Sequence, residues 1–326
     1  MQISPPRYRT ITIGALVALA VIIVTGAAVR LTGSGLGCDD WPNCSGERLI
    51  DVSSKHAAIE QINRLFTGVV VVAVIAAVLG SYRRAGPRRT DLIRLSWALV
   101  AGVVANAVLG GISVLVDLHP LAVQGHLILS MALIVTGTVL VRRAGEPDGA
   151  ERRVVVSHTA RRLTWIVFAL TTCAIFTGTL VTGAGPHAGD ENAERLDLDI
   201  EWVARIHGST VMIAIAMTLL IAWRLRSHPD DATLAGPVST WLFAGVLQAA
   251  IGYVQYFNDV PELLVGAHVA GATVVTWATT QLVFGTTQAR SGPHADVAST
   301  DAVVTAPVRA DLAGGYPRNV IQWRAE

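Results

Sequence analysis

The sequence contains eight apolar stretches, each long enough to cross the hydrocarbon core of a membrane. That core is about 30 Å thick, and a helix crosses it in about 20 residues, whereas barrel strands are about half as long. Because no water is present there to bond the backbone, stretches of this length must be helical. The composition agrees, with 52% hydrophobic residues, 15% charged residues and a mean hydropathy of +0.50. We therefore predict an all-α integral membrane protein with transmembrane helices over 11–29, 58–82, 93–116, 121–141, 162–182, 200–223, 237–257 and 262–285.

Arginine residues are distributed unevenly between the two sides of these helices. They gather in the amino terminus and in the connections that follow the even-numbered helices, among them Arg7, Arg9, Arg83, Arg84, Arg142, Arg143, Arg161, Arg162, Arg224 and Arg226. Positively charged loops stay in the cytoplasm. We therefore expect both termini to be cytoplasmic, in a cell membrane if the source is bacterial. The first stretch is interpreted as a membrane helix rather than a cleaved signal peptide, because no soluble domain follows it.

Two histidines, His126 and His268, begin apolar stretches that lie 142 residues apart. The same offset aligns Asn106-Ala-Val-Leu-Gly110 with Gln248-Ala-Ala-Ile-Gly252. An internal duplication is the simplest cause of such a match. Four helices separate equivalent points, so the two halves enter the membrane in the same direction. The prediction is two four-helix bundles related as a parallel repeat.

The domain organisation follows from the repeat. We predict an amino-terminal four-helix half over 11–145 and a carboxyl-terminal half over 160–286. Residues 1–10 are expected to form a cytoplasmic amino terminus. Residues 287–326 are rich in Ala, Gly, Asp, Thr and Pro without helical periodicity, and are expected to form a mobile cytoplasmic tail.

In the second half, His207 and His268 lie at similar depths near the outer ends of two helices. Neutral imidazoles on facing helices are a common way to hold a haem b iron. A histidine in a membrane helix also serves as a hydrogen-bonded packing residue. The duplication favours the first interpretation, so His207 and His268 are predicted as axial ligands of one haem.

The first half has His126 in the equivalent place but no histidine opposite it. Its second helix instead carries Glu60 and Asn63, which lie three residues apart and so share one helical face. A carboxylate there suits a proton acceptor or a site that orients water. The alternative is an interfacial glutamate paired with Arg64. If His126 alone holds an iron, one axial face is open for oxygen chemistry.

The most specific string of the chain connects the first two helices and reads Gly26-Ala-Ala-Val-Arg-Leu-Thr-Gly-Ser-Gly-Leu-Gly-Cys-Asp-Asp-Trp-Pro-Asn-Cys44. With Glu60-x-x-Asn63-Arg64 and the histidine spacing, it resembles the haem A synthase family. The resemblance implies an enzyme that oxidises the C8 methyl group of haem O to a formyl group by successive hydroxylations, supplying haem A to cytochrome oxidase. It also implies haem b on His207 and His268, and haem O beside His126 and Glu60. Asn63 departs from the family, where many members have histidine.

The outer loops supply further candidate residues. Cys38 and Cys44 face the oxidising side, and five intervening residues are enough to close a small disulfide loop, with either a structural or a redox role. Three arginines near outer helix ends are candidates to pair with haem propionates or to reach the membrane interface as long side chains, namely Arg30, Arg64 and Arg205.

Two other functions compete with a haem-modifying oxidoreductase. One is a bis-histidine haem b protein that only carries electrons, and the other is a parallel-repeat transporter whose histidines relay protons. The unequal halves favour the enzyme, because an electron carrier gives Glu60 and Asn63 no task. Expected partners are the haem O substrate, haem O synthase, an external electron acceptor and membrane lipid. A net charge of +1 provides no basic surface for nucleic acid.

Overall fold

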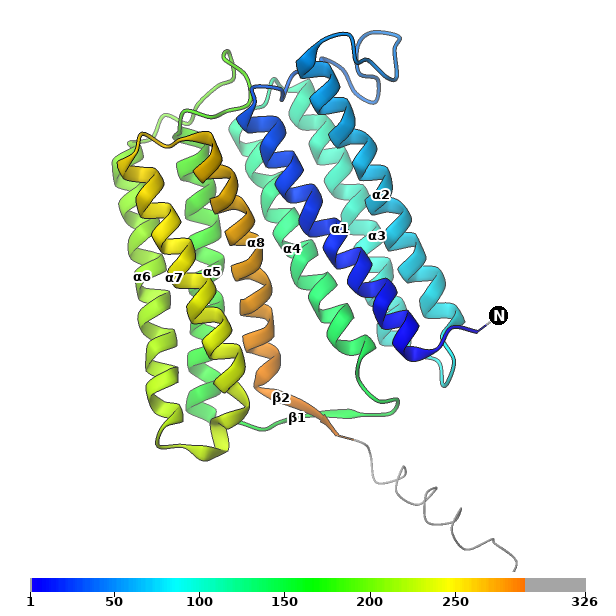
Figure 1. Ribbon diagram of the computed structural model, residues 1–326, viewed down its shortest axis with the longest axis vertical. Helices are drawn as coiled ribbons and strands as arrows, with labels where there is room; N and C mark the ends of the chain where they lie inside the picture. The colour runs from blue at the N-terminus through cyan, green and yellow to red at the C-terminus, as the bar shows by residue number, and fades with distance from the viewer. Residues whose placement is uncertain (1, 291–326) are drawn as a thin grey trace, which may run out of the picture. The chain divides into compact units, whose positions relative to one another are not determined.

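The computed structural model describes residues 2–290. In this part of the chain, eight helices are long and apolar enough to cross a membrane, which confirms the predicted all-α membrane fold class (Figure 1). They are α1 (Pro5–Leu31), α2 (Lys55–Arg83), α3 (Thr90–Leu115), α4 (Pro120–Ala144), α5 (His158–Ala184), α6 (Ile200–Leu225), α7 (Ala235–Phe257) and α8 (Glu262–Gly285). The short 3-10 helix η1 (Pro229–Leu234) precedes α7, and two strands, β1 (Glu151–Val154) and β2 (Thr287–Arg290), complete the described elements.

Most helices extend past the apolar stretch that predicts them, and polar side chains cap the starts of several. The side chain of Ser54 accepts the Ala57 amide at the start of α2, and Asp199 accepts two amides at the start of α6. A side-chain oxygen in this position satisfies an otherwise unpaired backbone donor of the first turn. Helix α1 begins at Pro5, so half of the predicted amino-terminal segment 1–10 is already helical.

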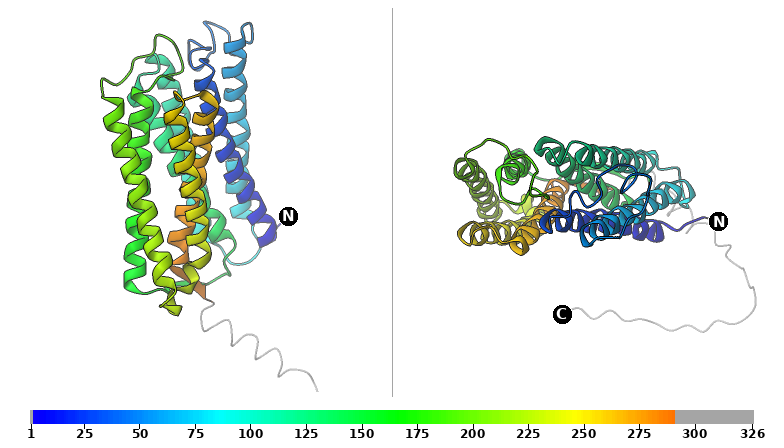
Figure 2. Two further views of the ribbon diagram at one scale, coloured as in Figure 1. Left: turned by 60° about the vertical axis from the view of Figure 1, so that its left-hand side comes forward. Right: turned by 90° about the horizontal axis from the view of Figure 1, so that it is seen from above.

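Helices α1–α4 and α5–α8 pack as two neighbouring groups (Figures 1 and 2). Each group has its own buried core, with Leu99 and Ile134 in the first and Val167 and Trp241 in the second. Helix α8 belongs to both, because it contacts α1 and α4 as well as α5 and α7. These groups coincide with the two predicted halves, whose relationship as a repeat remains a prediction.

The end of the helices that carries most arginines, here called the arginine end, is joined across the two halves. Strands β1 and β2 pair antiparallel, and Arg152 from β1 bonds Glu146 as well as the carbonyl oxygens of Phe284 and Thr287. The first four residues of the predicted tail, 287–290, instead form a paired strand. The remainder of that tail, 291–326, lies outside the described residues.

The opposite end, here called the disulfide end, is covered by two long loops. They are residues 32–54 between α1 and α2, the disulfide loop, and residues 185–199 between α5 and α6. The amide of Gly35 donates to the carbonyl oxygen of Gly189 over 2.9 Å, which joins the two loops. His187 in the second loop bonds the carbonyl oxygen of Val260 at 2.7 Å, next to the start of α8.

Candidate functional site: a cavity shared by both halves

A cavity of about 1540 Å³ extends through both halves and is lined by residues of all eight helices. Pockets for a single small ligand usually measure about 300–1,000 Å³. His126, His207 and His268 all line it, together with Glu60 and Asn63. The structure therefore brings the predicted catalytic and iron-binding residues of both halves to one continuous space large enough for more than one bulky ligand.

In the second half, the rings of His207 and His268 face each other across the cavity with centroids 6.2 Å apart. Two metal–nitrogen bonds of about 2 Å, with about 1 Å from each nitrogen to its ring centre, place two axial imidazoles about 6 Å apart. The Nδ1 atom of His207 lies 2.9 Å from the carbonyl oxygen of Ala174. Because a carbonyl only accepts, Nδ1 carries the proton and Nε2 is left as the ligand atom. The residues present thus fit a bis-histidine haem.

Each of the three histidine rings rests against a glycine of the preceding helix. A Cβ atom added to Gly110, Gly178 or Gly252 would lie 3.0, 3.1 or 3.0 Å from the Cε1 atom of His126, His207 or His268, respectively. A larger residue would therefore push the ring away from its place. The sequence offset aligned Gly110 with Gly252, but only the packing shows what the three glycines do, which is to leave room for an imidazole ring directly against the helix.

In the first half, His126 is oriented in the same way, with Nδ1 lying 3.1 Å from the carbonyl oxygen of Asn106. Asn63 occupies the opposite helix, and its Oδ1 accepts a hydrogen bond of 2.8 Å from the hydroxyl group of Thr25. Thr177 makes the matching contact in the second half, 3.3 Å from the Nδ1 atom of His207. Asn63 on α2 and His207 on α6 are thus each contacted by a threonine of the preceding helix.

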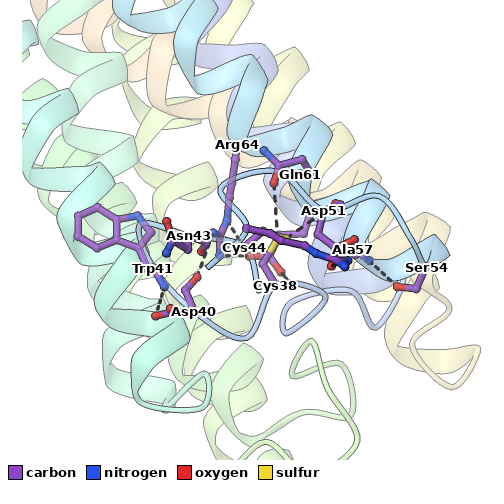
Figure 3. Close-up of a disulfide and its surroundings, with 12 residues drawn as sticks. Cys38, Asp40, Trp41, Asn43, Cys44, Asp51, Ser54, Ala57, Gln61 and Arg64 are labelled. Atoms are coloured by element: carbon purple, nitrogen blue, oxygen red, sulfur yellow. Dashed lines mark hydrogen bonds and ion pairs between the residues drawn. A yellow bond between two sulfur atoms is a disulfide. The ribbon is translucent and has the colours of Figure 1, made fainter. Parts of the chain in front are cut away.

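Glu60 is buried, with 5% of its surface exposed, and both of its carboxylate oxygens have partners. Its Oε1 accepts from Arg64 at 2.7 Å, and its Oε2 accepts the backbone amide of Cys38 at 2.7 Å. Arg64 also donates to the carbonyl oxygens of Asp40 and Asn43 (Figure 3). The Glu60–Arg64 pair therefore anchors the disulfide loop on α2 in addition to lining the cavity.

Cys38 and Cys44 form a disulfide, as predicted (Figure 3). It closes the tip of the disulfide loop above α2, and both cysteines are fully buried. Gly37, immediately before it, is pressed against the start of α2, where a Cβ atom would meet the carbonyl oxygen of His56 at 2.3 Å. Only glycine permits that approach, so the loop is fixed to the helix on both sides of Cys38.

The three candidate arginines have different surroundings. Arg30 reaches from α1 to α5 and donates to the carbonyl oxygen of Thr182 at 2.9 Å, while its buried Nε has no partner among the described residues. Arg64 is occupied by Glu60 and the loop carbonyls. The side chain of Arg205 is 75% exposed and pairs with Glu201 at 3.3 Å. All three line the cavity, and Arg30 has the most capacity left to bind an anion.

Sequence reasoning missed one contact of the site. The indole of Trp41, at the tip of the disulfide loop, lies directly on Gly111 of α3. Trp41 and Pro42 both line the cavity. The only sequence signal was the pair Gly110-Gly111, which places two residues without side chains on adjacent positions of one helix.

These features define a multi-pass membrane protein whose shared cavity has the donor set and spacing that a haem iron requires. The family described as cytochrome oxidase assembly protein matches residues 9–189, which is more than half of the sequence. The chain belongs to this family, and the predicted membership is confirmed.

Curated relatives extend the similarity across both halves. A protein named heme A synthase from Bradyrhizobium diazoefficiens is 29% identical over 82% of this chain and 88% of its own length. Proteins of the same name from Lysinibacillus sphaericus and Listeria welshimeri are 25% and 26% identical, over 67% and 78% of this chain and 75% and 87% of their own lengths. The similarity therefore covers most of each relative.

Proposed function

We propose that this protein is a haem A synthase, an oxidoreductase that converts haem O into haem A for cytochrome oxidase. Family membership and the names of the relatives support this activity. The observation that carries it is the inequality of two sites within one cavity. One side has two facing histidines, and the other has a single histidine opposite an amide and a carboxylate. A protein that only carries electrons has no use for the second arrangement.

In the second half, His207 and His268 would hold the iron of a resident haem b through their Nε2 atoms. When bound, this group supplies one-electron redox chemistry beside the substrate. The carbonyl oxygen of Ala174 fixes the tautomer and orientation of the His207 ring. Gly178 and Gly252 support the two rings from behind, so this half has the build of a permanent site.

In the first half, His126 would bind the iron of the substrate, haem O, and leave the opposite face open. Asn63 then acts as a hydrogen-bonding group and not as an iron ligand. Because Thr25 donates to its Oδ1, the amide nitrogen is the end of Asn63 that remains free to donate. An amide N–H in this position would orient water at the open face, while the C8 methyl group would be oxidised to formyl by successive hydroxylations, with an external acceptor taking up the electrons.

Glu60 complements Asn63 on the same helical face. Its two oxygens already accept from Arg64 and Cys38, and a carboxylate has further acceptor positions available. We assign it to the distal face, where it orients water and accepts a proton from it. The same hydrogen bonds attach the covering loop to the site, so water access and the position of the carboxylate are set together.

The surroundings follow from the chemistry of the substrate. Haem O is insoluble in water, so direct transfer from haem O synthase and exchange with membrane lipid are the expected routes. Arg30 is the leading candidate to pair with a propionate, since its Nε is buried and has no partner among residues 2–290. The disulfide end would face the outside of a bacterial cell membrane, with the arginine end cytoplasmic. Haem b held by His207 and His268 would supply one-electron redox chemistry, and an external acceptor would take up the electrons.

The test is to extract haems from membranes of a host that makes haem O but no haem A, with and without this protein. Chromatography and mass spectrometry should reveal haem A only when the protein is present. The matched control is His126→Ala, which should retain haem b and leave haem O unconverted. Persistence of haem O with wild-type protein that is folded and carries haem b would instead support an electron carrier.

A further inference from the structure

Trp41 and Tyr253 provide aromatic rings to the cavity in two different ways. The 142-residue offset that aligns Gly110 with Gly252 also aligns Gly111 with Tyr253. In the second half, the residue after Gly252, which packs against the His268 ring, is thus the aromatic residue Tyr253 on α7. In the first half that position is a glycine, and the aromatic ring arrives from the disulfide loop.

The indole of Trp41 fills the space above Gly111. A Cβ atom on Gly111 would lie 2.4, 2.6 and 2.8 Å from the Cδ2, Cε2 and Cγ atoms of that ring. The neighbouring Gly110 packs directly against the ring of His126. Because the two glycines are consecutive on α3, the indole and the imidazole pack against adjacent residues of that helix, and both border the same cavity.

The peptide that carries Trp41 is held on both sides but stays part of a loop. Arg64 donates to the carbonyl oxygens of Asp40, at 3.0 Å, and of Asn43, at 2.8 Å, which flank it. The backbone amide of Trp41 itself bonds the side chain of Asp40. The indole remains 37% exposed, and Figure 3 shows it extending away from the disulfide. The ring therefore has a defined resting place, on a loop segment and not on a membrane helix.

The second half has no comparable loop contact among the described residues. Tyr253 stacks on Phe257 with centroids 6.4 Å apart, within the same helix. Its hydroxyl oxygen lies 3.9 Å from the Cβ position of Gly208, the residue after His207. A ring on α7 keeps its backbone fixed and moves only by side-chain rotation, so it suits a group that stays in place. A loop-borne ring suits a group that must enter and depart.

We propose that Trp41 is a positioning residue for the substrate porphyrin, forming a removable wall of the first-half site that governs how long haem O stays bound. The proposal rests on the assignment of haem O to this half. An indole against a porphyrin gains from aromatic stacking and from removing apolar surface from water. Loss of the ring should accelerate haem O dissociation about tenfold, the change that corresponds to one such contact.

The experiment measures haem O dissociation from purified holoprotein in detergent, using excess apomyoglobin as the acceptor and the Soret band as the signal. Trp41→Ala and Gly111→Ala should both release haem O about tenfold faster, the second because its methyl group displaces the indole. Trp41→Phe should restore most of the retention. Tyr253→Ala is the matched variant, and it should loosen haem b while leaving haem O dissociation unchanged.

Retention of the haem b spectrum reports that the Trp41 and Gly111 variants are folded, and helical circular dichroism reports it for Tyr253→Ala, which is expected to loosen haem b. Should Trp41→Ala lose haem b as well, Gly111→Ala and Trp41→Phe decide the question. Unchanged haem O dissociation in folded Trp41→Ala or Gly111→Ala would overturn the proposal, as would equal acceleration by Tyr253→Ala. If wild-type protein binds haem O but makes no haem A, the proposed activity fails while faster dissociation from the Trp41 variants still upholds the wall.

Discussion

The hydroxyl group of Thr25 donates to the Oδ1 atom of Asn63 over 2.8 Å, in the place where Thr177 contacts the ring of His207. A Cβ atom added to Gly26, the residue after Thr25, would meet nothing within 4 Å. The space beside Gly178, in contrast, is occupied by the His207 ring. The first half thus retains a threonine and a glycine that suit a histidine, although it has an amide. The difference between the halves is a difference of one ligand within a similar frame.

Asn63→His should therefore add a second axial ligand to haem O bound on His126. The open space at Gly26 accommodates the ring, and Thr25 can accept its Nδ1 proton. We expect the optical and electron paramagnetic resonance spectra of the first-half haem to change from one-histidine to low-spin bis-histidine character. Asn63→Ala is the control and should leave the one-histidine spectrum. A first-half haem that is already bis-histidine in the wild-type protein would contradict the assignment.

Asn63→Ala should also lower haem A production, by about tenfold if the amide makes one hydrogen bond that strengthens during oxidation. Glu60→Ala should lower it further, because it removes both an acceptor of the distal face and a support of the loop. Haem A per mole of haem b in extracted membranes measures both effects. Full production by both variants would exclude these residues from the reaction.

Removing one histidine at a time should separate the two haem sites. His207→Ala and His268→Ala each delete one of two facing ligands and should empty the second half of haem b. His126→Ala should leave haem b in place and lose only haem O, because its ring lies on the other side of the cavity. Pyridine haemochrome spectra of the purified variants distinguish these outcomes. Equal loss of haem b from all three would show that the cavity has one site and not two.

The Glu60–Arg64 pair should stabilise the disulfide loop. Arg64→Ala leaves a 5% exposed carboxylate without its cation, and breaking such a pair usually costs about 3–5 kcal/mol. The 20% exposure of the Arg64 side chain reduces the expected loss to about 2 kcal/mol. The Glu60→Gln/Arg64→Ala double variant should recover part of it, since no charge remains unpaired. The cycle consists of the wild type, Glu60→Gln, Arg64→Ala and the double variant. Their thermal unfolding gives the coupling free energy between Glu60 and Arg64, and additive effects would refute a stabilising pair.

The disulfide should stabilise the same loop independently of any redox role. A bridge that closes so short a loop contributes about 2 kcal/mol by restricting the unfolded chain. We expect Cys38→Ser/Cys44→Ser to lower the thermal midpoint and to expose the loop between α1 and α2 to proteases, while haem b stays bound. If this variant were as protease-resistant as the wild type, the hydrogen bonds of Glu60 and Arg64 would be sufficient to hold the loop.

Much of this arrangement could be predicted from the sequence, because membrane helices and repeats depend on local patterns. The eight spans, the disulfide and the shared depth of His207 and His268 all follow from hydropathy, topology and an offset of residues. The bounds of α8 were predicted to the residue, but the start of α2 was not, because it is set by a polar cap, Ser54, beyond the apolar stretch. The contact of Trp41 with Gly111 was also beyond reach, because it joins positions 70 residues apart through the path of a loop.

The roles of Glu60 and Arg30 show a further limit. Spacing alone left open whether Glu60 pairs with Arg64 or faces the cavity, and the structure has it do both. Arg30 crosses from α1 to the carbonyl oxygen of Thr182 in the other half. Such contacts depend on how two bundles dock, and no periodicity within one helix records that.

Helix α8 carries His268 on the second half and at the same time packs against α1 and α4 of the first. Neither group of four helices therefore forms a complete core on its own, because α8 packs in both. A chain cut before α8 would lose the second haem ligand and also bare the inner surface of α1–α4. The two halves should accordingly melt as one cooperative unit, in spite of the duplication that their sequences suggest.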